Sequence, residues 1–239
     1  MIKDKVIGFF RKFAEALINP TLQSEINEGA LEVIATQRLN NLVKTYLPWS
    51  RASLSHVGML IILNDIFINQ RETILEFGSG ISTVYIAKFL QQHGKGHLFS
   101  VEQDKQWMEI VSDIIQKEGA EQYVTFIHAP LLRNSHALTP EGQWHDESIL
   151  LSQIPSSVDM LIVDGPADYP DAPDPLIRYP SLPIILPYLS SNCSVFLDDT
   201  VRRGERKIIA LWEQEFMMSF RRSGKISFAF RGEHYKPFI

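Results

Sequence analysis

Short apolar runs alternate with amphipathic stretches over the last two thirds of the chain. The apolar runs predict strands at residues 73–77, 97–102, 123–128, 158–163 and 194–198. Stretches with helical spacing of apolar residues follow most of these runs, and one begins after Thr200. A strand–helix unit repeated five times predicts a doubly wound, mostly parallel sheet, with ligands bound at the carboxyl ends of its strands.

The two ends of the chain depart from this repeat. Before the first strand, helices are expected at residues 2–18, at 22–45 and from His56 onward, with Ser55 as a cap. After the fifth unit, two closing strands are expected around 216–221 and 226–230. We therefore predict an N-terminal helical extension over residues 1–70 and a seven-stranded α/β domain over residues 71–239.

Three segments are less regular. Residues 131–151 contain a turn signal and predict either an irregular insertion or a short hairpin. Residues 165–180 are rich in Pro and Asp and predict a long loop at the ligand end of the sheet, followed by a helix over 181–189. The pattern assigns no structure to residues 234–239.

The turn after the first predicted strand carries the clearest chemistry. Gly78 and Gly80 allow a sharp turn with close approach to a ligand, and the free amides of the following helix favour polar groups. Glu76 suits a cationic group such as an ammonium. Glu102, at the tip of the second strand, suits two ribose hydroxyls. A ligand with an ammonium at one end and a ribose at the other matches S-adenosylmethionine.

These residues also carry a family resemblance. The run Glu76-Phe77-Gly78-Ser79-Gly80 resembles the first motif of class I (Rossmann-like) S-adenosylmethionine-dependent methyltransferases, and Glu102 matches the acid of their second strand. The resemblance covers about residues 70–230. It implies a small-molecule acceptor and a cofactor site made of Glu76, Gly78, Ser79, Gly80, Ser82, Thr83, Glu102, Gln103, His128, Ala129 and Asp164.

Two routes could remove the acceptor's proton. Asp164, Asp198 and Asp199 end neighbouring strands and could hold Mg²⁺, which would lower the pKa of an acceptor hydroxyl. Catechol-type O-methyltransferases are similar, because they have acidic residues at the ends of the same two strands, but they have Asp-Asn where this chain has Asp198-Asp199. The alternative is that Asp199 or Thr200 only caps the next helix. The second route is a histidine base, with His56, His128 and His145 as candidates.

Further residues are candidates for the acceptor pocket. The resemblance implies that the N-terminal helices cover the acceptor pocket, so Trp49, Ser53 and His56 are expected to line it. The candidates for catalytic residues are Asp164 and His56. Basic residues near the fifth strand could bind an anionic substrate, or could pair with acids on a solvated helix face; they are Arg178, Arg202, Arg203 and Arg206, with Tyr179 beside them.

Composition limits the partners and the cellular compartment to be expected for this chain. The net charge is −5 and no long basic run occurs, which argues against a nucleic-acid partner. The single cysteine, Cys193, allows no intrachain disulfide, and no signal peptide or membrane-spanning run is found, so a cytoplasmic protein is expected. The aromatic face of residues 2–18 is expected to pack on the domain or on a second subunit of a homodimer, or else to contact a membrane surface.

The predicted function is methyl transfer from S-adenosylmethionine to an oxygen of a small molecule. An aminopropyltransferase is the nearest alternative, because the Asp-rich loop could bind a polyamine. A protein that binds the cofactor without catalysis is another. Glu76 and Thr83 make a nicotinamide oxidoreductase less favoured, because the third glycine of the dinucleotide pattern is missing.

Overall fold

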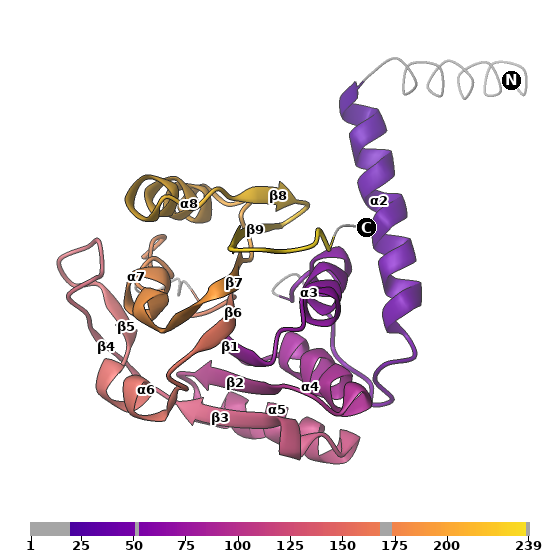
Figure 1. Ribbon diagram of the computed structural model, residues 1–239, viewed down its shortest axis with the longest axis horizontal. Coiled ribbons are helices and arrows are strands. Elements are labelled where there is room, and N and C mark those ends of the chain that lie inside the picture. Colours follow the sequence, from indigo (N-terminus) through magenta and orange to yellow (C-terminus); the bar gives the residue numbers. More distant parts are fainter. Residues whose placement is uncertain (1–19, 51–52, 168–173, 238–239) are drawn as a thin grey trace, which may run out of the picture.

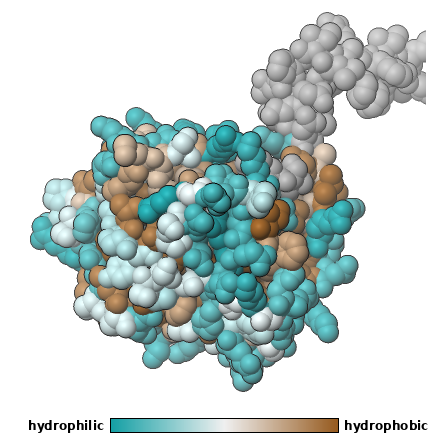
Figure 2. Space-filling model, viewed as in Figure 1, coloured by the Kyte–Doolittle hydropathy of each residue, from teal (hydrophilic) through white to brown (hydrophobic). Residues whose placement is uncertain are grey.

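The computed structural model describes residues 20–50, 53–167 and 174–237 (Figure 1). The helix expected at residues 2–18, with its packing or membrane role, lies outside these residues. Among the described residues no helix is both long and apolar enough to cross a membrane. Figure 2 shows hydrophilic residues over much of one face of the molecule, with hydrophobic residues scattered between them.

A seven-stranded sheet forms the centre of the molecule, as predicted. Its strand order is β3-β2-β1-β6-β7-β9-β8. The first five strands of this order are parallel, and β9 and β8 close the sheet in antiparallel fashion. The strands are β1 (Thr73–Phe77), β2 (His97–Glu102), β3 (Val124–His128), β6 (Val158–Val163), β7 (Leu189–Leu197), β8 (Arg221–Ser223) and β9 (Ile226–Arg231).

Helices cover both faces of this sheet (Figure 1). One face packs against α3 (His56–Ile68), α4 (Ile81–His93) and α5 (Lys105–Glu118), with α2 (Pro20–Leu39) outside α3. The other face packs against α6 (Glu147–Gln153), α7 (Ser181–Ile185) and α8 (Arg203–Phe216). Strand β1 shows why two cores form, because its alternate side chains point to opposite faces: Ile74 joins the first core, and Leu75 and Phe77 join the second.

Local sequence signals fix where several helices begin. The Ser55 hydroxyl accepts a hydrogen bond from the amide of Gly58 and caps α3. The Asp104 carboxylate accepts from the amides of Gln106 and Trp107 and caps α5. The cap at Ser55 was expected from the sequence.

Several boundaries differ from the prediction. Helix α2 ends at Leu39 instead of Thr45. Residues 131–151 form the predicted hairpin, β4 (Leu131–Arg133) with β5 (Gln143–His145), and α6 follows it. The helix expected over 181–189 stops at Ile185; a 3₁₀ turn, η2 (Leu186–Tyr188), leads into β7, as η1 (Glu121–Tyr123) leads into β3.

The two closing strands pair as expected, but the position predicted for the first of them, 216–221, is wrong. Helix α8 continues to Phe216, and Met217 ends it in a left-handed conformation with φ 51°. The apolar run that suggested a strand is therefore a helix end followed by a connection, and β8 begins only at Arg221.

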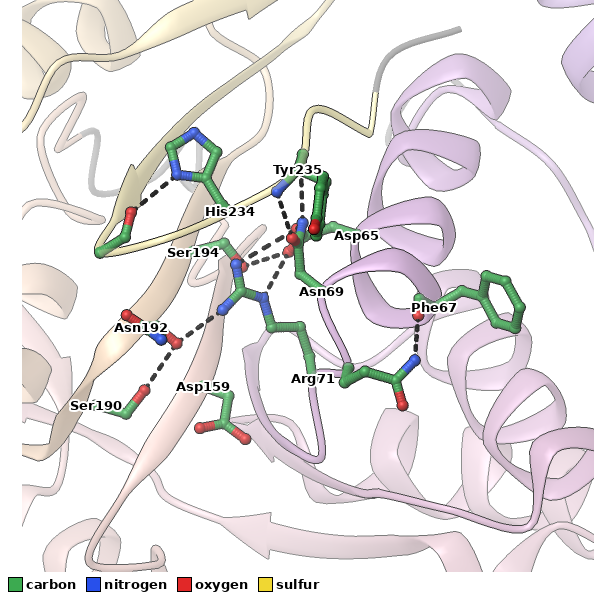
Figure 3. A network of polar contacts seen from close by, with 12 residues as sticks. Asp65, Phe67, Asn69, Arg71, Asp159, Ser190, Asn192, Ser194, His234 and Tyr235 are labelled. Carbon is green, nitrogen blue, oxygen red and sulfur yellow. Dashed lines mark hydrogen bonds and ion pairs between the residues drawn. The ribbon is translucent and has the colours of Figure 1, made fainter.

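A buried ion pair ties the end of α3 to β7 at the edge of the sheet opposite the ligand end (Figure 3). The guanidinium of Arg71 contacts the Asp65 carboxylate at 3.2 Å and donates to the carbonyl of Asn192 at 2.7 Å. The Ser194 hydroxyl donates to the same carboxylate at 2.6 Å. The C-terminal segment joins this network, because the amide of Tyr235 donates to the side chain of Asn69.

Candidate functional site

A cavity of about 380 Å³ lies at the carboxyl ends of β1, β2 and β6, where the topology places ligands. The turn after β1, the residues after Glu102 and the first turns of α5 form one side of it. After β6, the cavity is lined by Asp164, Gly165 and Ala167. The connection between α2 and α3 contributes Leu47, Pro48, Ser50, Ser53 and Leu54. We call it the cofactor cavity.

The turn after β1 and the segment after β6 touch through two glycines. Gly78 has φ +92°, and a Cβ placed on it would lie 2.9 Å from the nitrogen of Gly165. A Cβ on Gly165 would lie 2.7 Å from the Cα of Gly78. Side chains at either position would therefore push the two strand ends apart.

Glu76 lies beneath this turn and is fully buried. Its Oε2 atom accepts hydrogen bonds from the hydroxyls of Thr83 at 2.6 Å and Ser100 at 2.8 Å, and the Thr83 hydroxyl accepts from the amide of Gly80. Burial raises the pKa of Glu76 to about 6, against hydrogen bonds that lower it. In this arrangement the Glu76 carboxylate holds the turn.

Glu102 stands at the end of β2 and accepts hydrogen bonds from backbone amides of the turn after β1 and of the two residues that follow it. Its Oε2 accepts from the amide of Ser79 at 3.0 Å, and its Oε1 accepts from the amides of Gln103 and Asp104 at 2.9 Å. Burial raises the pKa of this carboxyl group, and the three amides lower it. The acid is thus fixed in position at the wall of the cavity.

No role was predicted for Trp107, yet this residue lines the cofactor cavity. Its indole N–H donates to the carbonyl of Ser79 at 2.7 Å, and 41% of the residue is exposed. An aromatic residue one turn into the helix after Glu102 is the signal that could have identified it.

The cavity brings together seven of the predicted cofactor residues, namely Gly78, Ser79, Gly80, Ser82, Glu102, Gln103 and Asp164. Four others, Glu76, Thr83, His128 and Ala129, do not line it. His128 lies within 3.2 Å of the carbonyl of Gln103, and the buried Ala129 donates its amide to the carbonyl of Glu102. Direct contact of these four with a cofactor remains a prediction.

Three carboxylates gather where β6 and β7 end, as predicted. Asp164, Asp198 and Asp199 each offer an oxygen, and these oxygens lie within 4.8 Å of one another. Burial and the neighbouring Asp198 raise the pKa of Asp164 well above its usual range. Burial and Asp199 raise the pKa of Asp198 to about 6. Asp199 has φ 58°, an uncommon conformation for a residue with a side chain.

Arg178 is buried in the middle of these acids. Its guanidinium lies 3.4 Å from Asp164 Oδ1, 3.5 Å from Asp199 Oδ2 and 3.8 Å from a carboxylate oxygen of Glu205. It also donates to the carbonyls of Asp164, Pro166 and Asp198 and so joins β6 to β7. The expectation that Arg178 binds an anionic substrate is therefore wrong, because acids of the chain already surround it.

Two other members of the basic group are also engaged. Arg202 pairs with Asp199 at 2.8 Å and with Glu205 at 3.7 Å, and Arg206 donates to the carbonyl of Val201. Thr200 donates to the carbonyl of Lys225. Helix α8 begins without a side-chain cap, so the capping role suggested for Asp199 or Thr200 is wrong.

The unpartnered oxygens of Asp198 make the acid cluster a candidate for a Mg²⁺ site. Both carboxylate oxygens of Asp198 are buried and accept no hydrogen bond from the described residues. Buried carboxylate oxygens without partners are costly unless a cation or a proton satisfies them. Three carboxylates give the oxygen ligands that Mg²⁺ prefers.

The predicted histidines lie in different surroundings. His145 is buried, and its Nδ1 contacts the carbonyl of Ala129 at 2.9 Å. Burial lowers the pKa of His145 to about 4. It lines neither the cofactor cavity nor the cavity at His56, so the structure does not support it as a base. His56 lines a second cavity, together with Trp49 and Ser53.

Comparison with known proteins identifies the fold and the family. A family model described as a methyltransferase domain matches residues 75–200, which is more than half of the chain. The chain belongs to this methyltransferase family. The match begins within β1 and ends three residues after β7, so it includes the glycine turn, Glu102 and the acid cluster.

Solved structures share the fold of the methyltransferase. An O-methyltransferase from Bacillus cereus in complex with S-adenosylhomocysteine has 16% identity and a TM-score of 0.56, with 85% of this chain and 91% of that chain covered. The O-methyltransferase TomG from Streptomyces achromogenes, with S-adenosylmethionine, has 16% identity, a TM-score of 0.55 and coverages of 86% and 99%.

A third structure, a Podospora anserina methyltransferase with S-adenosylhomocysteine, has 14% identity, a TM-score of 0.57 and coverages of 85% and 88%. No curated protein matches the sequence. At these identities the likeness establishes the Rossmann-like methyltransferase fold.

Proposed function

We propose that this methyltransferase transfers the methyl group of S-adenosylmethionine to an oxygen atom of a small molecule. The observation that carries the proposal is the joint position of the glycine turn and Glu102 on one cavity. The Bacillus cereus and Streptomyces achromogenes proteins, with the same fold, are O-methyltransferases whose structures contain S-adenosylhomocysteine and S-adenosylmethionine.

The residues of the cofactor cavity suit the parts of this cofactor. Glu102 would accept hydrogen bonds from the ribose hydroxyls, as acids at this position of a dinucleotide fold do. The turn at Gly78 to Gly80 lets the backbone approach the amino-acid end, and Trp107 offers an aromatic surface beside it. Glu76 fixes the turn through Thr83, so its contribution to binding comes through the backbone it holds.

Methyl transfer is a displacement at carbon, so the protein must align the acceptor and remove its proton. Asp164 lines the cofactor cavity and is also a member of the acid cluster, so the cluster adjoins the cavity. Asp164, Asp198 and Asp199 would hold Mg²⁺, and the ion would lower the pKa of an acceptor hydroxyl. Arg178 keeps the cluster in place by joining the ends of β6 and β7.

The test is a transfer assay with S-adenosylmethionine labelled on its methyl group. The protein is incubated with a panel of small hydroxyl, amine and thiol compounds, with Mg²⁺ or with a chelator. We expect labelled methyl ethers and equimolar S-adenosylhomocysteine, with lower rates in the chelator and in Asp198→Asn. Label on nitrogen or sulfur alone would contradict the choice of oxygen. Aminopropyl transfer from the decarboxylated cofactor to a diamine would support the rival enzyme.

A further inference from the structure

A second cavity, of about 580 Å³, adjoins the cofactor cavity. Ser50, Ser53 and Leu54 line both cavities, so the two lie side by side. The other walls come from α2, from the start of α3 and from the turn between β8 and β9. The volume is in the range of small-molecule sites. A molecule bound here would lie beside the cofactor, which an acceptor requires.

One wall of the second cavity is aromatic. The rings of Trp49 and His56 are stacked, with centroids 3.8 Å apart and planes at 18°. Apolar side chains continue the wall, among them Leu31 and Val201, the latter 46% exposed. Flat apolar walls of this kind favour a planar ring over a saturated one, because stacked rings gain contact over a whole face.

His56 is held by an acid from another helix. Its Nδ1 lies 3.4 Å from a carboxylate oxygen of Glu32 on α2, and the two side chains are 25% and 39% exposed. With a carboxylate at Nδ1, Nε2 is the ring nitrogen left to meet a ligand. A carboxylate in this position orients an imidazole and stabilises the imidazolium that forms when it takes a proton. Glu28, Arg222 and Lys225 are the other charged residues that line the cavity.

We propose that the second cavity binds a planar aromatic compound with a ring hydroxyl, and that His56, positioned by Glu32, takes the hydroxyl proton. The acceptor class rests on the proposed function, because a methyl acceptor must reach the cofactor. An imidazole removes a proton from an aromatic hydroxyl more easily than from an aliphatic one. The reason is that the pKa of a phenol, near 10, lies closer to the pKa of an imidazole than the pKa of an aliphatic hydroxyl does.

The hydroxyl proton moves to Nε2 of His56, and the oxygen uses an electron pair to bond the methyl carbon. The carbon–sulfur bond of the cofactor breaks, and its electron pair stays on sulfur. The products are an aryl methyl ether, S-adenosylhomocysteine and an imidazolium that returns its proton to water.

Binding is tested with 2-naphthol and its saturated analogue, decahydro-2-naphthol, titrated into protein saturated with S-adenosylhomocysteine. We expect 2-naphthol to bind about tenfold more tightly than the analogue. The Trp49→Leu substitution should weaken the binding of 2-naphthol by about this factor. Tyr46→Leu is the matched control, since Tyr46 is 86% exposed in the same connection and does not line the cavity. Equal binding of 2-naphthol to wild type and Trp49→Leu would overturn the proposal.

Catalysis is tested by turnover of an aromatic hydroxyl acceptor. His56→Asn should lower kcat by about 10² to 10⁴, and added imidazole should restore part of it in His56→Gly. Glu32→Gln should lower kcat and leave KM for the acceptor unchanged, which a merely structural role would not do. His136→Asn, at an exposed turn, is the control.

Two outcomes separate this proposal from the function on which it rests. Tight binding of S-adenosylhomocysteine without binding of 2-naphthol would overturn the acceptor site and leave the methyltransferase proposal standing. Failure of the wild-type protein to bind S-adenosylhomocysteine would overturn both. Retention of full kcat in His56→Asn would overturn the role of His56.

Discussion

The cofactor cavity depends on contacts between individual atoms of a few small residues. Gly78 and Gly165 bring the ends of β1 and β6 together, and Glu76 holds the turn through Thr83 and Ser100. The importance of Gly78 could be predicted from the sequence, because a glycine directly after a strand allows a sharp turn of the backbone there. The contact with Gly165 was not, because 87 residues separate the two in the chain.

Gly78→Ala tests the close approach. The alanine would meet the nitrogen of Gly165 and would also adopt an unfavourable positive φ. Gly94→Ala is the matched control, because Gly94 also has positive φ, +66°, but open space around its Cβ position. By urea unfolding we expect a loss of about 1–2 kcal/mol for Gly94→Ala and a further 1–3 kcal/mol for Gly78→Ala. Equal losses of unfolding free energy in the two variants would show that the structure relieves the clash at Gly78 without losing stability.

Glu76 predicts a pH dependence of stability. Its pKa rises from an ordinary 4.5 to about 6 in the folded protein. The folded state therefore holds the proton more tightly, and this stabilisation, complete below pH 4.5, is lost as the pH rises through 6. The loss corresponds to about 2 kcal/mol.

Glu76→Gln should not show this loss, because an amide does not ionise and its oxygen can still accept from Thr83 and Ser100. The measurement is the free energy of unfolding between pH 4.5 and 7.5, compared with Glu109→Gln, an exposed position on α5. A difference between wild type and Glu76→Gln that stays constant over this range would contradict the burial effect.

At the level of elements, the sequence predicted the five parallel strands and the helices between them, because each strand is a short apolar run. It failed where an apolar run has another cause. Residues 216–220 contain four apolar residues, but they end α8 and lead to β8, and Met217 is 93% exposed. The position of α8 depends on packing of residues such as Trp212 in the second core, which the local pattern does not reveal.

The attachment of α3 to the sheet also escaped the sequence. The buried pair of Arg71 and Asp65 at the end of α3 is joined to β7 by hydrogen bonds (Figure 3). This pair fixes one end of α3, and the other end carries His56 at the second cavity. The C-terminal segment, to which no structure was assigned, packs here as well, with the carbonyl of Pro237 accepting from Asn64.

Arg71→Met tests this attachment. Removing the guanidinium leaves the Asp65 carboxylate buried without its cation, which costs about 3–5 kcal/mol. Lys95→Met is the control, because Lys95 pairs with Glu72 at 2.6 Å but both side chains are about half exposed. That change should cost less than about 1 kcal/mol. Similar losses in urea unfolding would show that burial of the Arg71 pair is not important for stability.

At the level of the whole molecule, the site is assembled from segments that lie far apart in the chain. The sequence predicted the glycine turn, Glu102 and the acid cluster, because strand ends of a parallel sheet meet at one edge. It could not predict that Arg178 lies among the acids, that Trp107 lines the cofactor cavity, or that Glu32 holds His56. Each of these depends on how a loop or a helix packs against the sheet edge.

The central claim is that the cofactor cavity binds S-adenosylmethionine through Glu102. The most direct test is calorimetric titration of the protein with S-adenosylmethionine and S-adenosylhomocysteine, with NAD as a control ligand. Wild type and Glu102→Ala are compared, and Glu109→Ala, from the exposed face of α5, is the matched variant. Loss of hydrogen bonds to a carboxylate should weaken binding about 10- to 100-fold in Glu102→Ala only.

Saturable binding of both cofactor forms to wild type and Glu109→Ala, weakened in Glu102→Ala, is the result that we expect. Binding of NAD alone, or equal affinity of wild type and Glu102→Ala for S-adenosylmethionine, would contradict the account.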